Sequence, residues 1–232
     1  MKYLHVAAHP DDLDFGAAGT TATLTAAGDE VVYCLVTDGQ AGGFDNTITR
    51  EQMATIRREE QTAAAKVVGV TEIHFLGFPD GAVEANLALR KALARVIRQV
   101  RPDRVVTQSP ERNLDRFYGS HPDHLAVGES CLNAVYPDSR NEFAFPELLA
   151  DEGLEPHTVS EVWLVGGPDP DHHVDITDTF DRKIEALLCH VSQIQDPENM
   201  PTFLREWAER NGKAAGLAEG RCAESFRRVI TS

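Results

Sequence analysis

Two short segments of the chain place histidine and aspartate beside proline, each after a short apolar run. Residues 8–12 read Ala-His-Pro-Asp-Asp, and residues 121–124 read His-Pro-Asp-His. Imidazole nitrogen and carboxylate oxygen are both ligands of catalytic zinc, which usually takes three ligands from protein and leaves the fourth position to water. Together, the two segments predict a hydrolase that depends on a bound metal ion.

Three residues of these segments are the candidate metal ligands. His9 and Asp12 lie three positions apart in the loop after the first predicted strand, where Pro10 restrains the turn so that both side chains can face one crevice. His124 is the third ligand and leaves one coordination position for water. A metal ion in such a site lowers the pKa of bound water to about 7 and polarises a carbonyl group. Zinc is the expected ion, although other divalent transition ions accept the same ligands.

The neighbouring polar residues suit acid–base work. Asp11 is the candidate general base that takes the proton of the attacking water, and His121 is the candidate donor to an oxyanion or a leaving group. Asp123 suits a supporting role, in which its carboxylate accepts a hydrogen bond from a ring N–H and sets the tautomer of a histidine. Asp14 is expected to be the N-cap of the following helix.

Apolar periodicity and turn residues indicate alternating strands and helices. Strands are predicted over residues 3–8, 30–37, 72–76 and 104–108, and helices over residues 16–27, 50–68, 86–100 and 121–135. A fifth strand is expected at 161–165, followed by helices at 180–191 and 201–211 and an edge strand at 228–231. His172 and His173 fall in an expected surface loop.

This alternation is typical of an α/β protein. We expect residues 1–232 to form a single domain with a Rossmann-like, doubly wound, mostly parallel sheet and helices on both faces. With the strand order 3-2-1-4-5, a crevice forms beyond the carboxyl ends of the first and fourth strands, where such sheets bind ligands. The two His/Asp segments follow these two strands, so the topology predicts that they meet in one site.

The composition argues against several classes of partner. With 22 Lys and Arg against 37 Asp and Glu, the formal net charge is −15, which disfavours binding to nucleic acid or to anionic membranes. The start of the chain lacks a signal-peptide pattern, and no apolar stretch reaches the length of about 20 residues that a membrane span needs. The four scattered cysteines are expected to be free thiols. We therefore expect a cytoplasmic protein that acts on a small molecule.

The two His/Asp segments also resemble a known family. Residues 8–12 and 121–124, with the small-residue stretch 16–20, resemble the LmbE-like zinc de-N-acetylases, relatives of N-acetylglucosaminyl-phosphatidylinositol de-N-acetylase and of the mycothiol and bacillithiol pathway deacetylases. The resemblance continues in order along most of the chain. It runs through Thr37-Asp38-Gly39, Arg57-x-x-Glu60, Phe75-Leu76-Gly77, Asp80-Gly81 and His190-Val191-Ser192-Gln193.

The resemblance implies the same roles for these residues as their chemistry does. His9, Asp12 and His124 match zinc ligands. Asp11 matches the general base, and His121 matches the residue that supports the oxyanion or the leaving amine. The implied reaction is zinc-dependent hydrolysis that removes an acetyl or other acyl group from the amide nitrogen of an amino-sugar-type or related small molecule.

Three further residues match positions at the substrate of the family. Arg57 and Asp80 match positions that contact the sugar, whereas by themselves they would fit a helix-face salt bridge and a turn. Tyr118 resembles a mobile tyrosine that some members place near the tetrahedral intermediate, but it stands one residue further from the second His/Asp segment. The expected partners are an N-acylated small molecule and, as in many relatives, further copies of the same chain.

Two other functions fit parts of the sequence. Asp12-Leu13-Asp14 after an apolar strand resembles the Asp-x-Asp motif of haloacid-dehalogenase-type phosphatases, in which an aspartate attacks phosphorus. That function leaves His9 and the second His/Asp segment without a role. A metal-binding or ligand-binding relative without activity is the other alternative, but it would need neither Asp11 nor His121.

Overall fold

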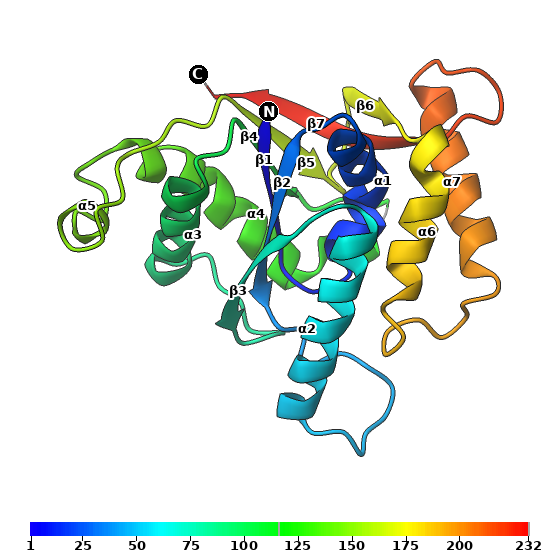
Figure 1. Ribbon diagram of the computed structural model, residues 1–232, viewed down its shortest axis with the longest axis horizontal. Helices are drawn as coiled ribbons and strands as arrows, with labels where there is room; N and C mark the ends of the chain where they lie inside the picture. The colour runs from blue at the N-terminus through cyan, green and yellow to red at the C-terminus, as the bar shows by residue number, and fades with distance from the viewer. Residues whose placement is uncertain (116, 232) are drawn as a thin grey trace.

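The computed structural model describes residues 1–115 and 117–231, which fold around a seven-stranded sheet (Figure 1). The strand order is β3-β2-β1-β4-β5-β7-β6; β1 to β5 run parallel, and β7 pairs antiparallel with β5 and β6. The strands are β1 (Lys2–Ala7), β2 (Glu30–Thr37), β3 (Glu72–Phe78), β4 (Arg104–Gln108), β5 (Glu161–Val165), β6 (His172–Asp175) and β7 (Ala223–Ile230). The expected α/β class and the order 3-2-1-4-5 are confirmed.

Helices cover both faces of the sheet, as Figure 1 shows for α3 and α4 on one side and α1 and α6 on the other. Alternate residues of β1 face the two layers: Leu4 and Val6 pack with the α3 and α4 side, and Tyr3 and Ala7 pack with the α1 and α2 side. The helices are α1 (Asp12–Ala26), α2 (Arg50–Val67), α3 (Leu87–Val100), α4 (Pro122–Val135), α5 (Glu147–Ala150), α6 (Phe180–Leu188) and α7 (Met200–Ala214).

Local sequence signals place the ends of the helices beside the site. Thr49 begins α2 with a capping box, because its hydroxyl accepts the Gln52 N–H while the Gln52 side chain accepts the Thr49 N–H. Asn86 caps α3 through its side chain, which accepts the Leu89 N–H. His121 caps α4, and Pro122 occupies the first helical position, where its missing N–H is not needed. The predicted boundaries of these three helices are confirmed to within one residue.

The carboxyl-terminal part of the sheet differs from the prediction. The expected edge strand at 228–231 belongs to β7, which begins at Ala223 and lies between β5 and β6. The edge is β6, which contains His172 and His173, so the expected surface loop was wrong. The ring of His172 packs on Trp163, with 4.3 Å between the ring centroids. The strand β6 has only four residues and just one of them is aliphatic. It therefore lacks the apolar pattern by which a strand is predicted from sequence.

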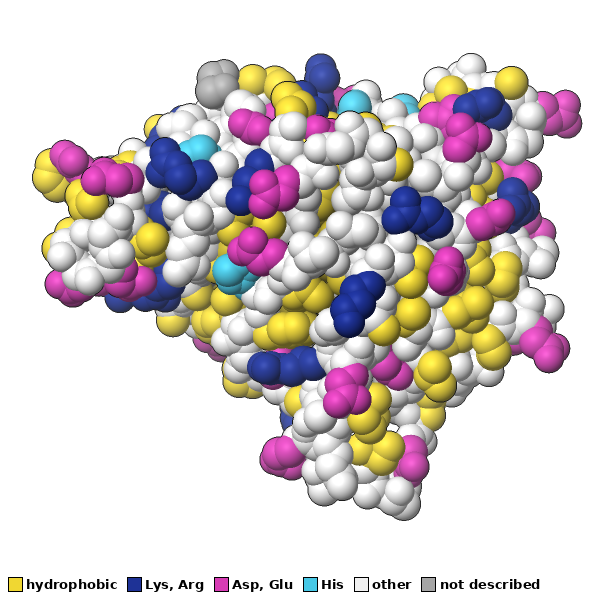
Figure 2. All heavy atoms as spheres, in the orientation of Figure 1, with side chains coloured by type: hydrophobic (Ala, Val, Ile, Leu, Met, Phe, Trp, Pro, Cys, Tyr) yellow, Lys and Arg dark blue, Asp and Glu magenta, His cyan; other side chains and the backbone are white. Residues whose placement is uncertain are grey.

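Charged side chains and a few apolar ones lie on the surface of the described residues. On the face in Figure 2, basic and acidic side chains are interspersed, and apolar side chains gather over α6 and α7, where Leu188 and Phe203 are exposed. The four cysteines are free, as expected. Among the helices of the described residues, none has both the length and the apolarity to span a membrane.

Candidate functional site

Two loops at one edge of the sheet build the candidate site. The first leaves β1 and reaches α1 at Asp12, and the second leaves β4 and reaches α4 at Pro122. Because β1 and β4 are neighbouring parallel strands, their carboxyl ends lie at the same edge, and both loops start there (Figure 1). The sheet thus brings together the two His/Asp segments that the sequence analysis expected to meet.

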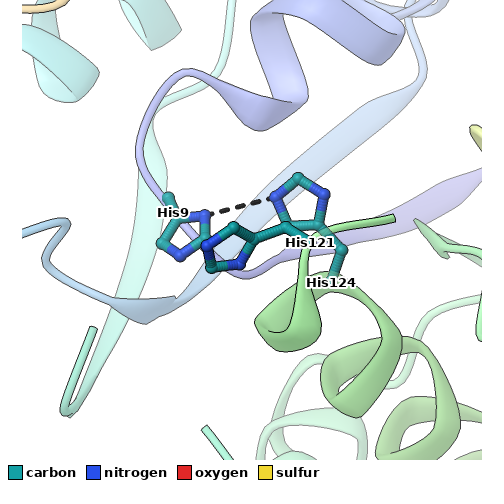
Figure 3. Close-up of side chains that lie close together, drawn as sticks. All are labelled: His9, His121 and His124. Carbon is teal, nitrogen blue, oxygen red and sulfur yellow. Dashed lines mark hydrogen bonds between the residues drawn. The ribbon is translucent and has the colours of Figure 1, made fainter. Parts of the chain in front are cut away.

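Three side chains that can bind a metal ion meet between these loops. His9 Nδ1 lies 3.2 Å from Asp12 Oδ2, His124 Nε2 lies 3.1 Å from Asp12 Oδ1, and the two ring nitrogens are 3.3 Å apart. Figure 3 shows the rings of His9 and His124 turned toward each other, with His121 beside them. Tetrahedral zinc with bonds of about 2.0–2.1 Å separates its ligand atoms by about 3.3 Å. The three residues therefore have the chemistry and the spacing of a tetrahedral metal site.

Two carboxylates orient the His9 ring from behind. His9 Nε2 lies 3.0 Å from Asp80 Oδ1 and 3.1 Å from Asp123 Oδ2. Asp123 is fully buried and also accepts the backbone N–H groups of Gly81 and Val83. A carboxylate on Nε2 holds the ring proton there and leaves the Nδ1 lone pair directed at Asp12 and His124. The contact that the sequence predicted between Asp123 and a histidine ring is present.

Other groupings around His9 are also compact enough for a metal ion. His9, His121 and His124 offer ligand atoms within 4.8 Å of one another, and so do His9, Asp80 and Asp123. In the second grouping, the acidic side chains are already engaged: Asp123 as described, and Asp80 by His9 and by the Ala41 N–H at 2.7 Å. His9 Nδ1 faces Asp12 and His124 on the other side of the ring, so a metal ion held there would leave the contacts of Asp80 and Asp123 with Nε2 intact.

The electrostatics of this cluster favour a bound cation. Burial disfavours a charged His9 ring, but the carboxylates of Asp12, Asp123 and Asp80 outweigh burial and raise its pKa to about 12. Burial likewise opposes protonation of His124, whose pKa is nevertheless raised by Asp12. The three carboxylates therefore place negative charge on both sides of the His9 ring.

Asp11 lies beside the cluster with a different environment. Its carboxylate Oδ2 is 3.1 Å from Arg57 Nη2. Burial raises the pKa of Asp11 to about 7, in opposition to the Arg57 charge, which lowers it. A carboxyl group with a pKa near neutrality can both take and return a proton at physiological pH. The geometry thus suits the predicted general base.

His121 presents one ring nitrogen to the cluster. Its Nδ1 accepts the Asp123 N–H at 3.2 Å, so the neutral ring carries its proton on Nε2. Burial, and the neighbouring rings of His9 and His124, lower the pKa of His121. Its ring centroid lies 5.1 Å from that of His9 and 5.3 Å from that of His124. A neutral Nε2–H beside the metal ligands suits a hydrogen-bond donor to a reacting oxygen or amine.

The three residues predicted at the substrate lie in unlike environments. Arg57 is buried on α2, where it donates to the carbonyls of Gly39 and Pro10. Asp80 is buried against His9. Tyr118 lies on the 3₁₀ turn Phe117–Ser120 and is 98% exposed. Arg57 and Asp80 therefore contact the candidate base and a candidate ligand, and contact of all three residues with a substrate stays a prediction.

A second layer of polar residues, which the sequence pattern did not indicate, lies behind Asp11. Asp14 is not the helix cap that was expected: α1 begins one residue after Asp11, and Asp14 is fully buried in its first turn. Its carboxylate accepts hydrogen bonds from Gln61 and His190. The available signal was a polar residue, Gln61, on the apolar face of the α2 helix pattern, four positions after Arg57.

A cavity of 440 Å³ opens from the cluster. Asp12 and His124 are among its lining residues, and both apolar and charged side chains complete the lining, with Phe15 and Trp207 among the apolar ones and Lys183, Glu224 and Arg227 among the charged ones. Ligand-binding cavities commonly enclose about 300–1,000 Å³. The site therefore has room for a small molecule next to the metal-ligand cluster.

Fold and site together define an α/β hydrolase with a candidate His/Asp metal centre at the switch point of its sheet. Comparison with known sequences identifies the family within this class. Residues 4–135 match the family described as PIG-L, GlcNAc-PI de-N-acetylase. The chain belongs to this family, and the resemblance found in the sequence is confirmed.

The most similar proteins include deacetylases. A diacetylchitobiose deacetylase from Thermococcus kodakarensis is 35% identical over 94% of this chain and 81% of its own. A probable N-acetyl-alpha-D-glucosaminyl L-malate deacetylase 2 from Bacillus cereus is 32% identical over 81% of each chain. The solved structure of N,N'-diacetylchitobiose deacetylase from Pyrococcus horikoshii matches with a TM-score of 0.90 and 33% identity, covering 99% of this chain and 84% of that one. The expected hydrolase and deacetylase class is confirmed.

Proposed function

We propose that this protein uses zinc to hydrolyse the N-acetyl group of a small amino-sugar substrate. The observation that carries this proposal is the close approach of His9 Nδ1, the Asp12 carboxylate and His124 Nε2, whose neighbouring atoms lie 3.1–3.3 Å apart, a spacing that fits the ligands of a tetrahedral zinc ion. The relatives support the substrate class, because the similar proteins include two diacetylchitobiose deacetylases and a probable N-acetyl-alpha-D-glucosaminyl L-malate deacetylase.

In this proposal His9, Asp12 and His124 hold the ion. When bound, zinc supplies a Lewis acid for the amide carbonyl and lowers the pKa of a bound water. Asp80 and Asp123 keep the His9 ring aimed, because both accept from Nε2 while Nδ1 faces Asp12 and His124. Their carboxylates also place negative charge behind the ring, which strengthens it as a ligand.

Asp11 and His121 carry the proton transfers. Asp11 takes one proton from the attacking water as the C–O bond forms at the amide carbon. His121 donates from Nε2–H to the carbonyl oxygen as negative charge develops there. When the C–N bond breaks, Asp11 returns its proton to the departing nitrogen, so that water and amide give acetic acid and an amine, and the acid then passes its proton to the amine.

The alternatives from the sequence fit the structure less well. In the phosphatase motif, Asp12 would be the nucleophile, yet each of its carboxylate oxygens contacts an imidazole nitrogen. Asp14, the second aspartate of that motif, is fully buried and bonded to His190. A protein that only binds metal gives no reason for a carboxyl group with a pKa near 7 beside the ligands.

The test is acetate release from N-acetylglucosamine and N,N'-diacetylchitobiose by wild type and by Asp11→Asn. We expect wild type to release acetate and the variant to lose about 10²–10⁴-fold in kcat, the usual contribution of a general base, while both keep their zinc. Asp178→Asn makes the same chemical change at an exposed position in the 3₁₀ turn after β6 and is the matched control. Equal rates for Asp11→Asn and wild type would contradict the proposal.

Three further proposals concern the domain organisation, the identity of the metal ion and the oligomeric state. Strands from Lys2 to Ile230 share one sheet, which supports a single domain over residues 1–232. Activity after removal of the metal and loading with zinc, iron or cobalt in turn would identify the ion that this ligand set prefers. Sedimentation would test the homo-oligomer that the family resemblance implies.

A further inference from the structure

Asp11 adopts a backbone conformation that residues other than glycine rarely take. Its φ is 85° and its ψ is −30°. Such a conformation is strained and persists only where the surrounding contacts over-determine it. Because Asp11 is also the proposed general base, the groups that hold its backbone also set the direction of its carboxylate.

Helix α2 supplies two of these contacts from residues one turn apart. Arg57 donates to the Pro10 carbonyl and lies beside the Asp11 carboxylate. Gln61 is fully buried, and its Oε1 accepts the Asp11 backbone N–H at 2.9 Å. Residues four positions apart lie on the same face of a helix. The two side chains thus hold the carbonyl before Asp11, its amide and its carboxylate.

Gln61 is held in turn by a buried carboxylate. Its Nε2 donates to Asp14 Oδ2 at 2.8 Å, and the same oxygen accepts from His190 Nε2 at 2.8 Å. Gln61, Asp14 and His190 are each fully buried. An ionised carboxylate can only accept hydrogen bonds. Asp14 therefore requires the NH₂ group of Gln61 to face it, which leaves the amide oxygen for the Asp11 N–H.

We propose that Gln61 is a positioning residue for Asp11, oriented by Asp14 and His190. Neither Asp14 nor His190 reaches the reacting atoms; they act by fixing which end of the Gln61 amide faces Asp11. One residue from α1, one from α2 and one from the turn after α6 thereby set the β1–α1 loop. The inference rests on the proposed function in one respect, the assignment of Asp11 as the base.

Two variants test the proposal from different sides. Gln61→Met keeps the approximate length of the side chain but has no amide oxygen for the Asp11 N–H. Asp14→Asn keeps the size of the side chain but can also donate, so the Gln61 amide can turn and present NH₂ to the Asp11 N–H. We expect each to lower kcat for acetate release by about 10²-fold, the scale of a misplacement of about 1 Å. KM and zinc content should be unchanged, and the double variant should be no slower than the slower single variant.

A matched control separates positioning from stability. Thr21 lies on α1 like Asp14, is fully buried, and makes hydrogen bonds with His5 and Tyr33. Thr21→Val should therefore lower Tm without changing kcat. Crystal structures of zinc-loaded wild type and Gln61→Met add a readout that is independent of activity, and we expect Asp11 to leave its positive φ only in the variant.

Three results would overturn the proposal. They are kcat values of Gln61→Met and Asp14→Asn within about twofold of wild type, an unchanged positive φ of Asp11 in Gln61→Met, or loss of zinc in proportion to loss of activity. The last would mean that Gln61 holds the metal ligands and not the base. A wild type that releases no acetate, together with a changed φ in Gln61→Met, would contradict the proposed function but leave the positioning role standing.

Discussion

Two buried histidines lie four residues apart at β1, and their surroundings act on them in opposite ways. His5 lies within the strand, and His9 lies in the loop beyond its carboxyl end; their exposed fractions are 0% and 8%. Burial lowers the pKa of His5 to about 3. Burial acts in the same direction on His9, but Asp12, Asp123 and Asp80 outweigh it and raise its pKa to about 12.

The difference lies in what each ring faces. The ring of His5 stacks on Tyr33 at 5.8 Å between centroids and shares one hydrogen bond with Thr21, so it is stable as a neutral core residue. The ring of His9 has carboxylates at both nitrogens. Burial by itself therefore does not mark a functional histidine. What distinguishes His9 is the carboxylates on both sides of its ring, and they support its proposed role as a metal ligand.

The largest effect should come from removing His9. We expect His9→Ala to lose acetate-releasing activity by more than the roughly 10²–10³-fold that removal of a single oxyanion-stabilising donor costs, since the metal-bound site itself is lost. His5→Phe, four residues earlier, should keep its activity at a reduced Tm. The comparison is a steady-state assay of both variants at saturating zinc. Similar activity losses in the two would remove the distinction between the two histidines.

A smaller effect is expected from the carboxylate behind His9. Asp123→Asn keeps the shape of the side chain but no longer places a negative charge at His9 Nε2. We expect zinc affinity to fall by about 10–100-fold, the usual range for a group that orients a metal ligand. Competition with a chromophoric chelator measures this change. An affinity equal to that of wild type would show that Asp80 alone orients the ring.

The smallest effect concerns the pH dependence of stability at His5. The pKa of this ring is about 3 in the folded protein and about 6.5 in the unfolded chain. Between these values the unfolded state binds the extra proton, so the free energy of unfolding falls as the pH drops below about 6.5. From pH 7.5 to 5.5 we expect wild type to lose about 1 kcal/mol more than His5→Phe does.

Urea unfolding of both proteins at several pH values measures this difference. Groups other than His5 titrate in both proteins and cancel in the comparison. Identical slopes of unfolding free energy against pH would show that His5 does not carry the expected burial penalty.

Most of the candidate site could be predicted from the sequence, because its candidate metal ligands and acid–base residues lie in two short segments that each follow a strand. The pairing of His9 and Asp12 with His124 followed from the order of parallel strands, which alternation of strands and helices predicts well. Helix limits near Thr49 and Asn86 also followed from local capping signals. These features depend on neighbours in the chain, so the sequence displays them directly.

The features that were missed depend on distant contacts. Asp14 looked like a helix cap, because nothing near it in sequence shows that Gln61 and His190 would bury it. The strand β6 was missed because His172 and His173 are half-buried through contacts that are distant in sequence, which are the pairing with β7 and the packing of His172 on Trp163. Side chains from three separate elements make the layer behind Asp11, and no local pattern connects such elements.

Metal content tests the central claim most directly. Untagged wild type and His9→Ala would be purified side by side, without added metal, and measured by mass spectrometry. We expect about one equivalent of zinc in wild type and almost none in the variant, since His9 is one of the three proposed protein ligands. A wild type that carries no transition metal and binds no added zinc would contradict the account.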